Sequence, residues 1–311
     1  MDDQLASRFA AWHKPPGTRE DATFDALIAT PQAAAAMRRL SLNNLKLAAQ
    51  DTALDGIMKD IGRFSATGLA MYLHASGGLT LPRLKELCSR TGLISPGRAR
   101  ALLIYLRFLR YVAPAQGNDR TMLYVPTPGL MRAWQSMMRA TLDAATVIEP
   151  AVGLFSNALA REDVLLSIIR HEGELSLFSI NLDEKNNPFW QVFLNRHAGV
   201  QILHRLMVSA PEDTEYPPRA PLPFSTSDLA REFRVSRPHV ARLLKAAAEA
   251  GLVAVDGNTL ILTEDLKAHL RKMMGLRLAT AIVAAALTHR EQHGGDASLP
   301  ARAATADRAL L

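Results

Sequence analysis

The sequence predicts a mainly α-helical protein with short β-hairpins, in which helices join two copies of one domain. Apolar residues recur at helical spacing through most of the chain, which is typical of amphipathic helices. Asp256-Gly257-Asn258 separates two short apolar runs, as in a β-hairpin. The stretch from Leu79 to Thr127 also resembles the stretch from Phe224 to Thr263. A repeat that occurs twice indicates a duplicated domain rather than a solenoid.

Length and composition fit a folded globular protein of about two ordinary domains. Of the 311 residues, 48% are hydrophobic and 21% are charged, and the single cysteine is Cys88. One cysteine cannot form an intrachain disulfide, so a disulfide-stabilised scaffold is excluded. The acidic start of the chain lacks the pattern of a secretory signal. The longest apolar stretch, near 278–287, is shorter than the roughly 20 residues of a membrane helix. We therefore expect a cytoplasmic protein.

The chain carries a net charge of +6, which favours a polyanionic partner. Its 28 arginines far outnumber its 8 lysines, a bias that a GC-rich genome also produces. The positions of the arginines in the fold therefore decide between these two explanations.

Changes in composition divide the chain into five segments. Residues 1–30 contain Pro15-Pro16-Gly17 and little periodicity, which predicts a mobile N-terminal arm. The other segments are a first repeated domain over 31–142, a connecting segment over 143–187, a second repeated domain over 188–291 and a disordered tail over 292–311.

The first domain and the connecting segment are predicted to contain mostly helices. Helices are expected at 32–50, at 64–74, around Cys88, at 98–111 and at 161–171, and short strands at 122–127 and 175–180. We expect Cys88 to be a small core residue rather than a redox sensor, which would require an exposed thiol of low pKa.

The second domain repeats this order, beginning with an apolar helix over 189–209. A short helix follows, which Thr226 or Ser227 can cap and which ends at Phe233. Helix, short helix and tight turn are the first three parts of the repeated unit.

A longer helix and a hairpin complete the second domain. Ser236 is placed to cap this longer helix, which runs to Ala250. Gly251 follows at the position where a helix end favours a left-handed residue. Two strands within 252–262 form the hairpin, and Thr263 begins a final helix. This order of elements is that of a winged helix-turn-helix.

The segment Val235-Ser236-Arg237-Pro238-His239-Val240-Ala241-Arg242-Leu243-Leu244-Lys245, running on to Gly251-Leu252-Val253, resembles the recognition helix of bacterial winged-helix transcription regulators of the MarR and GntR groups. The resemblance covers the second domain and, through the repeat, Phe64–Met138. It implies tandem winged-helix domains and DNA binding. Winged helices also serve as dimerisation modules, so the fold alone does not establish DNA binding.

The longer helix of the second domain has one apolar and one basic face. Its core face is formed by Val240, Leu243, Leu244 and Ala247. Its opposite face is formed by Pro238, Arg242, Lys245 and Glu249. An arginine at this place can pair with guanine in the major groove, and neighbouring cations can neutralise phosphates. The alternative is a solvated helix face that happens to carry arginines.

These arguments predict a set of DNA-contacting residues in both domains. In the second domain they are Thr226, Arg234, Ser236, Arg237, Pro238, His239, Arg242, Lys245 and Asn258. The first domain adds auxiliary contacts by Arg98, Arg100 and Arg120. Arg120 lies in a loop over 115–121 that is long enough to enter a minor groove.

The longer helix of the first domain differs because its outward face is apolar. The residues equivalent to Pro238, Arg242, Lys245 and Glu249 are Gly97, Ala101, Ile104 and Phe108. An exposed apolar stripe is normally covered by a partner. We therefore expect the first domain to serve mainly in packing or dimerisation.

Motifs of enzyme and metal sites are missing from the sequence. It contains no glycine-rich phosphate loop, no His-Glu-x-x-His motif and no cysteine pair, so we expect no enzyme activity, metal or cofactor. His171-Glu172-Gly173-Glu174 is expected to be a solvated helix end rather than an acid–base site. His197 and His204 are expected to share one helix face as packing or polar-face residues. Trp134, Trp190, Met137, Met138, Met273 and Met274 are expected in the core, where they can also line an apolar pocket for an unassigned effector.

We interpret the protein as a cytoplasmic transcription regulator that binds double-stranded DNA as a homodimer through its second domain. The alternative is an assembly protein, either a plasmid replication initiator with tandem winged helices or a chromosome-organising protein that docks other proteins. Palindromic half-sites would favour the regulator, and direct repeats or no DNA binding the alternative. An apolar helix over 273–287 is expected to pair with its twin in the dimer, and otherwise to lie across the first domain.

Overall fold

The computed structural model describes residues 27, 29–92, 94–115, 121–179, 187–212 and 215–293, with the backbone alone at 178 and 179. The expected N-terminal arm and C-terminal tail therefore lie almost wholly outside the described residues. Arg120 lies outside them too.

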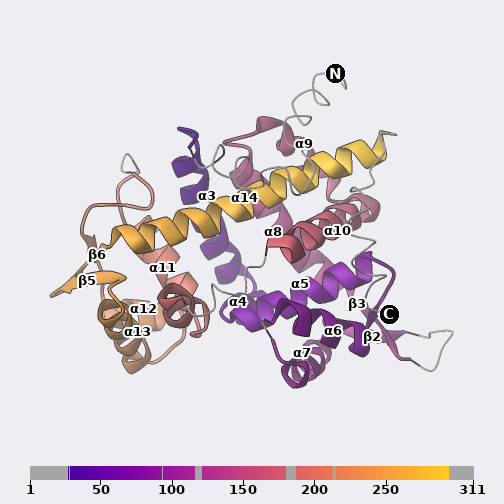
Figure 1. The fold of residues 1–311 in the computed structure, drawn as a ribbon, viewed down its shortest axis with the longest axis horizontal. Helices are drawn as coiled ribbons and strands as arrows, with labels where there is room; N and C mark the ends of the chain where they lie inside the picture. The colour runs from indigo at the N-terminus through magenta and orange to yellow at the C-terminus, as the bar shows by residue number, and fades with distance from the viewer. Residues whose placement is uncertain are drawn as a thin grey trace.

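Helices make up most of the described chain (Figure 1). The first half contains α3 (Ala33–Gln50), α4 (Thr52–Met58), α5 (Ile61–Ala75), β1 (Leu79–Thr80), α6 (Leu81–Thr91), α7 (Pro96–Phe108), β2 (Val112–Ala115), β3 (Leu123–Pro126) and α8 (Pro128–Ala145). The connection contains the 3-10 helix η1 (Pro150–Gly153), α9 (Leu154–Ala158) and α10 (Glu162–Ser179). The predicted class, mainly α with short β-hairpins, is confirmed.

The second half begins with a π-helix, η3 (Trp190–Leu194). It continues with α11 (Gly199–Val208), β4 (Leu222–Pro223), α12 (Thr226–Glu232), α13 (Arg237–Glu249), β5 (Val253–Asp256), β6 (Thr259–Leu262) and α14 (Glu264–Gln292). In the described residues the strands form two antiparallel sheets, ordered β1-β3-β2 and β4-β6-β5.

Residues 61–145 (the first unit) and 199–292 (the second unit) show the same order of elements. In each unit a helix leads to a short strand, two helices, a hairpin and a last helix. The backbone repeats as well, because the shorter helix is followed by a left-handed residue, Gly92 in one unit and Arg234 in the other, both with φ of 54°. Another left-handed residue follows the longer helix, Arg110 in the first unit and Gly251 in the second. The turns that orient α7 and α13 are thus alike.

Two expected elements are different in the structure. The strand expected at 175–180 is wrong over its described part, because residues 175–179 continue α10. Leu175 and Leu177 pack against the core from this helix, and such tertiary packing outweighs local strand propensity. The helix expected over 189–209 is interrupted at Ala198, whose φ is 59°. A Cβ on the next residue, Gly199, would lie 2.2 Å from the carbonyl oxygen of Phe193, so only glycine fits at this position.

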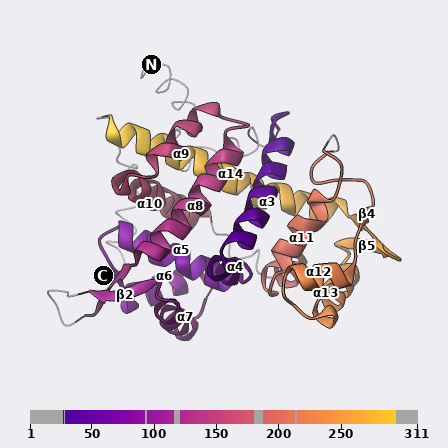
Figure 2. The ribbon, with the colours of Figure 1, turned by 180° about the vertical axis from the view of Figure 1, so that it is seen from behind.

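Helix α14 connects the two units. It starts directly after β6 and runs along α10, α8 and α3, as both ribbon views show (Figures 1 and 2). Met274, Leu278 and Ile282 are buried there within the same chain, and Ile282 is 0% exposed. Of the two arrangements expected for residues 273–287, the structure has the intramolecular one. The apolar face of this helix is therefore buried within its own chain.

Every helix in the described part of the chain is too short or too polar to cross a lipid bilayer.

Candidate nucleic-acid interface

Helix α13 presents the basic face that its sequence predicts. Ser236 caps the helix, and its hydroxyl accepts the backbone N–H of His239 at 3.2 Å. Val240, Leu243, Leu244 and Ala247 are buried on the core face. Arg237, Pro238, Arg242, Lys245 and Glu249 are exposed on the other side. The two predicted faces of the helix are thus confirmed.

The exposed cations of α13 keep most of their donors for an outside partner. Arg242 Nε donates to the Pro238 carbonyl at 3.2 Å, one turn earlier in the helix. Lys245 Nζ lies 3.7 Å from a Glu249 carboxylate oxygen, and both side chains are largely exposed. A solvated ion pair of this kind is worth little, so a phosphate can replace it at small cost.

The cap of α12 is Ser225, not Thr226 or Ser227 as expected. Ser225 has an extended backbone, and its hydroxyl accepts the N–H of Asp228. Thr226 is the first helical residue. Asn258 lies in the hairpin turn as expected, and its carbonyl accepts the Phe224 N–H at 2.9 Å. Asn258 and Ser225 line one groove of about 430 Å³.

Helix α7 is confirmed to have an apolar outward face. Gly97, Ala101, Ile104 and Phe108 are all exposed, with 54% of Ile104 and 81% of Phe108 accessible. Arg100 is exposed on the same helix, whereas the guanidinium of Arg98 pairs with Asp60 at 3.0 Å. The two predicted auxiliary contacts on α7 therefore differ in how far their charge is already compensated.

Four residues, Lys59, Asp60, His197 and Ala198, form a short bridge between α7 and α13. His239 on α13 bonds through Nε2 to the His197 carbonyl at 2.8 Å. The Ala198 N–H donates to the Lys59 carbonyl at 2.8 Å, and Asp60 accepts Arg98 of α7. We call these four residues the inter-helix bridge.

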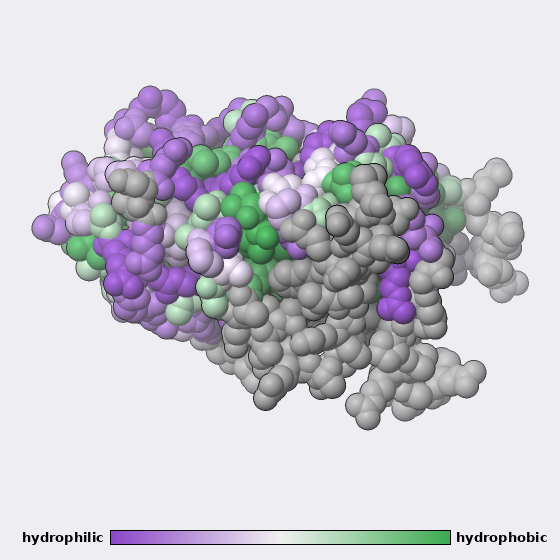
Figure 3. Space-filling model, turned by 90° about the horizontal axis from the view of Figure 1, so that it is seen from above, coloured by the Kyte–Doolittle hydropathy of each residue, from purple (hydrophilic) through white to green (hydrophobic). Residues whose placement is uncertain are grey.

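The bridge places α7 and α13 on one edge of the molecule. Both helices lie along the lower edge in the two ribbon views (Figures 1 and 2). Each packs inward against the shorter helix of its unit, α6 or α12, so its exposed face points outward. The opposite face, seen from above in Figure 3, mixes hydrophilic and hydrophobic residues, with a hydrophobic patch near its middle.

Several cationic side chains surround His197 on the bridge. Burial lowers the pKa of His197, and the charges of Lys59, Arg63 and His239 lower it further, against a smaller opposite effect of Asp60. Arg63 also lies over the Tyr105 ring of α7, 4.8 Å from its centroid. Arg196 donates to the Arg242 carbonyl at 3.3 Å. Carbonyls and rings do not neutralise these arginines, so their charge remains for an anionic partner.

Sequence reasoning missed this bridge. His197 and His204 were expected on one helix face, but the break at Ala198 separates them, and that expectation is wrong. His197 is exposed, whereas His204 is buried on α11 and its Nδ1 lies 2.8 Å from Ser41 Oγ. Tyr216 donates to the same hydroxyl at 2.7 Å. The imidazole of His204 thus joins α3 to the second unit.

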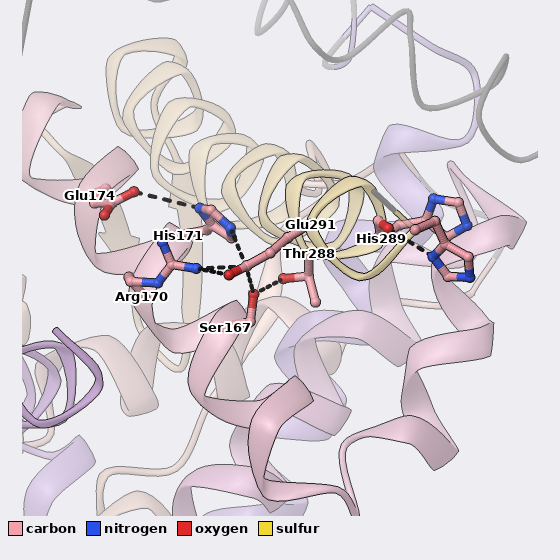
Figure 4. A network of polar contacts seen from close by, with 8 residues as sticks. Ser167, Arg170, His171, Glu174, Thr288, His289 and Glu291 are labelled. Atoms are coloured by element: carbon pink, nitrogen blue, oxygen red, sulfur yellow. Dashed lines mark hydrogen bonds and ion pairs between the residues drawn. The ribbon is translucent and has the colours of Figure 1, made fainter. Parts of the chain in front are cut away.

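The cluster at His171 is buried rather than a solvated helix end, which corrects the expectation for residues 171–174. His171 lies in the middle of α10 with Nε2 3.3 Å from a Glu291 oxygen of α14 (Figure 4). Ser167 and Arg170 donate to the same carboxylate. Burial raises the pKa of Glu291, but these bonds outweigh it and the net pKa is lowered.

This arrangement is a structural tie rather than a nucleophile and base. Ser167 Oγ donates to Glu291 at 2.6 Å, not to the imidazole, so His171 is not placed to take its proton. Glu291 instead holds α14 against α10 through one carboxylate, as Figure 4 shows. In the described part of the chain, no three His, Cys, Asp or Glu residues are grouped to hold a metal ion.

Most of the tryptophans and methionines expected in the core are buried. Trp134, Met137, Met138 and Met274 are buried, whereas Trp190 and Met273 are partly exposed. Cys88 is buried, and burial raises its pKa to about 11, which is opposite to a reactive thiol. Trp134 also lines a cavity of about 140 Å³ between α5, α8, α10 and α14.

No protein-family model, no curated protein and no solved structure matches this chain.

Proposed function

We propose that the chain is a transcription regulator with two winged helix-turn-helix units, and that α13 reads double-stranded DNA. The observation that carries the proposal is the exposed face of α13. It presents Arg237, Arg242 and Lys245 behind the Ser236 cap, and its first acidic residue is Glu249 at the far end. A helix that is basic in its N-terminal half and buried on its other face suits the major groove.

The proposed residues have distinct roles at the DNA. Arg242 pairs with a guanine edge, because the bond that it makes within the helix uses Nε and not the terminal nitrogens. Lys245 and Arg234 neutralise phosphates. Asn258 and Thr226 lie at the hairpin turn and the start of α12, where contacts to the sugar-phosphate backbone are expected.

The winged-helix assignment rests on the repeated order of elements. Each unit has a short first strand that pairs with the second strand of the hairpin. Each has a serine cap on the longer helix, Ser95 in the first unit and Ser236 in the second. These shared features support a tandem pair of one fold.

We propose that two copies of the chain form a homodimer through a surface other than the apolar face of α14, because that face is buried within its own chain.

A specific observation favours a second candidate, the assembly protein. Ile104 and Phe108 give α7 an exposed apolar stripe that a protein partner can cover. In that function the first unit docks a protein, and the second unit binds repeated DNA sites or none.

Selection from a random duplex library tests the proposal. The purified chain should enrich one sequence motif, and a variant with Arg237, Arg242 and Lys245 changed to alanine should enrich none. A palindromic motif supports the regulator and a direct repeat the assembly protein. If the chain and the triple variant retain the same unselected DNA, the proposal fails.

A further inference from the structure

We propose that α7, the inter-helix bridge and α13 form one continuous surface, with which a single chain contacts one uninterrupted stretch of duplex DNA. The N-terminal turns of both helices face the same duplex, and the bridge faces the phosphates between them. This inference rests on the proposed function and assigns DNA contacts to residues between the two units.

The geometry starts from two residues at the same position of the repeat. Arg98 is the third residue of α7, and its N–H is accepted by Ser95; His239 is the third residue of α13, and its N–H is accepted by Ser236. The side chains of both residues bond to the bridge. The N-terminal turns of the two helices are therefore held near each other, separated only by residues 59–60 and 197–198.

The bridge is anchored in the interior, so this separation is fixed. Lys59 forms a buried ion pair with Asp55, and Gln201 of α11 donates to the same carboxylate at 3.2 Å. Breaking a buried pair by removing one partner is strongly destabilising, so the contact resists displacement. The two helices therefore meet a partner as one rigid element.

Positive charge continues along this edge from one helix to the other. Arg100 is exposed on α7, Arg63 follows beside Tyr105, and His197 lies on the bridge. Arg196 is placed against the α13 backbone. The acidic side chain on the bridge, Asp60, is engaged by Arg98 and by the N–H of Arg63. A row of arginines along a rigid edge, with His197 among them, matches the regular charge of a duplex backbone.

The apolar end of α7 lies away from this row. Phe108 is ten residues beyond Arg98, which is about 15 Å along the helix. The N-terminal turn of α7 can therefore approach DNA while Phe108 stays outside the contact. A protein partner on the apolar stripe is the alternative that the test below separates.

Charge reversal along the edge tests the inference in the full chain. The variants are Arg100→Glu, Arg196→Glu and His197→Glu. Arg132→Glu, at an exposed arginine of α8, is the control with the same change in net charge as the two arginine variants. The probe is the duplex enriched by selection, in a series of increasing lengths, with anisotropy at several salt concentrations. Circular dichroism confirms that each variant folds.

Arg100→Glu and Arg196→Glu should each bind about tenfold more weakly than the control and lower the salt slope by about one for each phosphate that is no longer neutralised. His197→Glu places a new negative charge beside the phosphates and should also weaken binding. The wild-type affinity should keep rising with duplex length beyond the α13 site. Arg100→Glu should remove this gain and shorten the footprint on one side, while base preference stays unchanged.

If the three edge variants match Arg132→Glu in affinity, salt slope and footprint while Arg242→Ala weakens binding, this inference is overturned and the proposed function stands. If Arg242→Ala also binds like wild type, the proposed function itself fails.

Discussion

Arg98 and His239 occupy the same position in the two copies of the repeat, and the side chain of each bonds to the same bridge of four residues. Arg98 reaches Asp60 through its guanidinium, and His239 reaches the His197 carbonyl through its imidazole. The two units offer equivalent positions, and different side chains use them to join the units. These two bonds therefore help to fix how α7 lies relative to α13. Both act at the N-terminal ends of the helices.

Removing the charge of Asp60 should strengthen DNA binding. Asp60→Asn keeps an oxygen that can accept the Arg63 N–H and cap α5, but it releases Arg98 from its ion pair. We expect the affinity for nonspecific duplex to rise about threefold or more, with a steeper salt slope. Anisotropy titrations measure both. Asp143→Asn, which releases Arg39 in the same way on α3, is the matched control and should leave the affinity unchanged.

Arg242 and Lys245 should differ in what they contribute. Arg242→Ala should weaken binding to the selected site by about 1–3 kcal/mol and relax the preference at one base position. Lys245→Ala should weaken all duplexes nearly equally and lower the salt slope by about one. Titrations with selected and scrambled duplexes separate the two effects. Equal binding by both variants and wild type would show that α13 does not read DNA.

His204 should make the folded state less stable in mild acid. Burial lowers the pKa of His204 to about 4, below the ordinary value near 6.5. Between these values the unfolded chain binds the proton and the folded protein does not, so the free energy of unfolding falls as the pH decreases. The loss amounts to about 3 kcal/mol once the pH reaches 4.

Urea unfolding at pH 7 and pH 4.5 measures this loss. His204→Gln should be less stable than wild type at pH 7, because its contact with Ser41 changes, but should lose less on acidification. The same acid-induced loss in wild type and variant would assign the pH dependence to other groups.

DNA binding should take up a proton at His197. Burial and the charges of Lys59, Arg63 and His239 lower its pKa in the free protein, while Asp60 acts in the opposite direction. A nearby phosphate raises that pKa, so the complex holds the proton more tightly and affinity should fall as the pH rises. Dissociation constants at several pH values measure the effect. His197→Gln should show a flatter pH profile, and an unchanged profile would contradict the placement of DNA at the bridge.

Ile282→Arg should unfold the chain rather than separate a dimer. Ile282 is fully buried between α14 and the rest of the same chain, and an unpaired charge there costs several kcal/mol. Circular dichroism should show lost helix and size exclusion should show aggregation. Ala268→Arg places the same side chain on an exposed position of α14 and should remain folded. A folded Ile282→Arg monomer would contradict the intramolecular packing.

Local signals in the sequence were sufficient for the elements of the site. Ser236 and Gly251 mark the ends of α13, and its apolar spacing predicts which side chains are buried. The bridge could not be predicted, because His239 and His197 are 42 positions apart and Arg98 and Asp60 are 38 apart. Such contacts depend on how whole helices pack. The break at Ala198 could not be predicted either, because it depends on the close approach of the backbone at Gly199 to the backbone at Phe193.

The path of α14 has a consequence for cooperativity. The helix leaves the second unit after β6 and is buried along α8 and α10, so the last element of one copy completes the interior of the other. A fragment cut between the two units would expose apolar side chains of α14 in one half and of α8 and α10 in the other. We therefore expect the two units to unfold together in one transition, and a substitution in α14 to destabilise the first unit as well as the second.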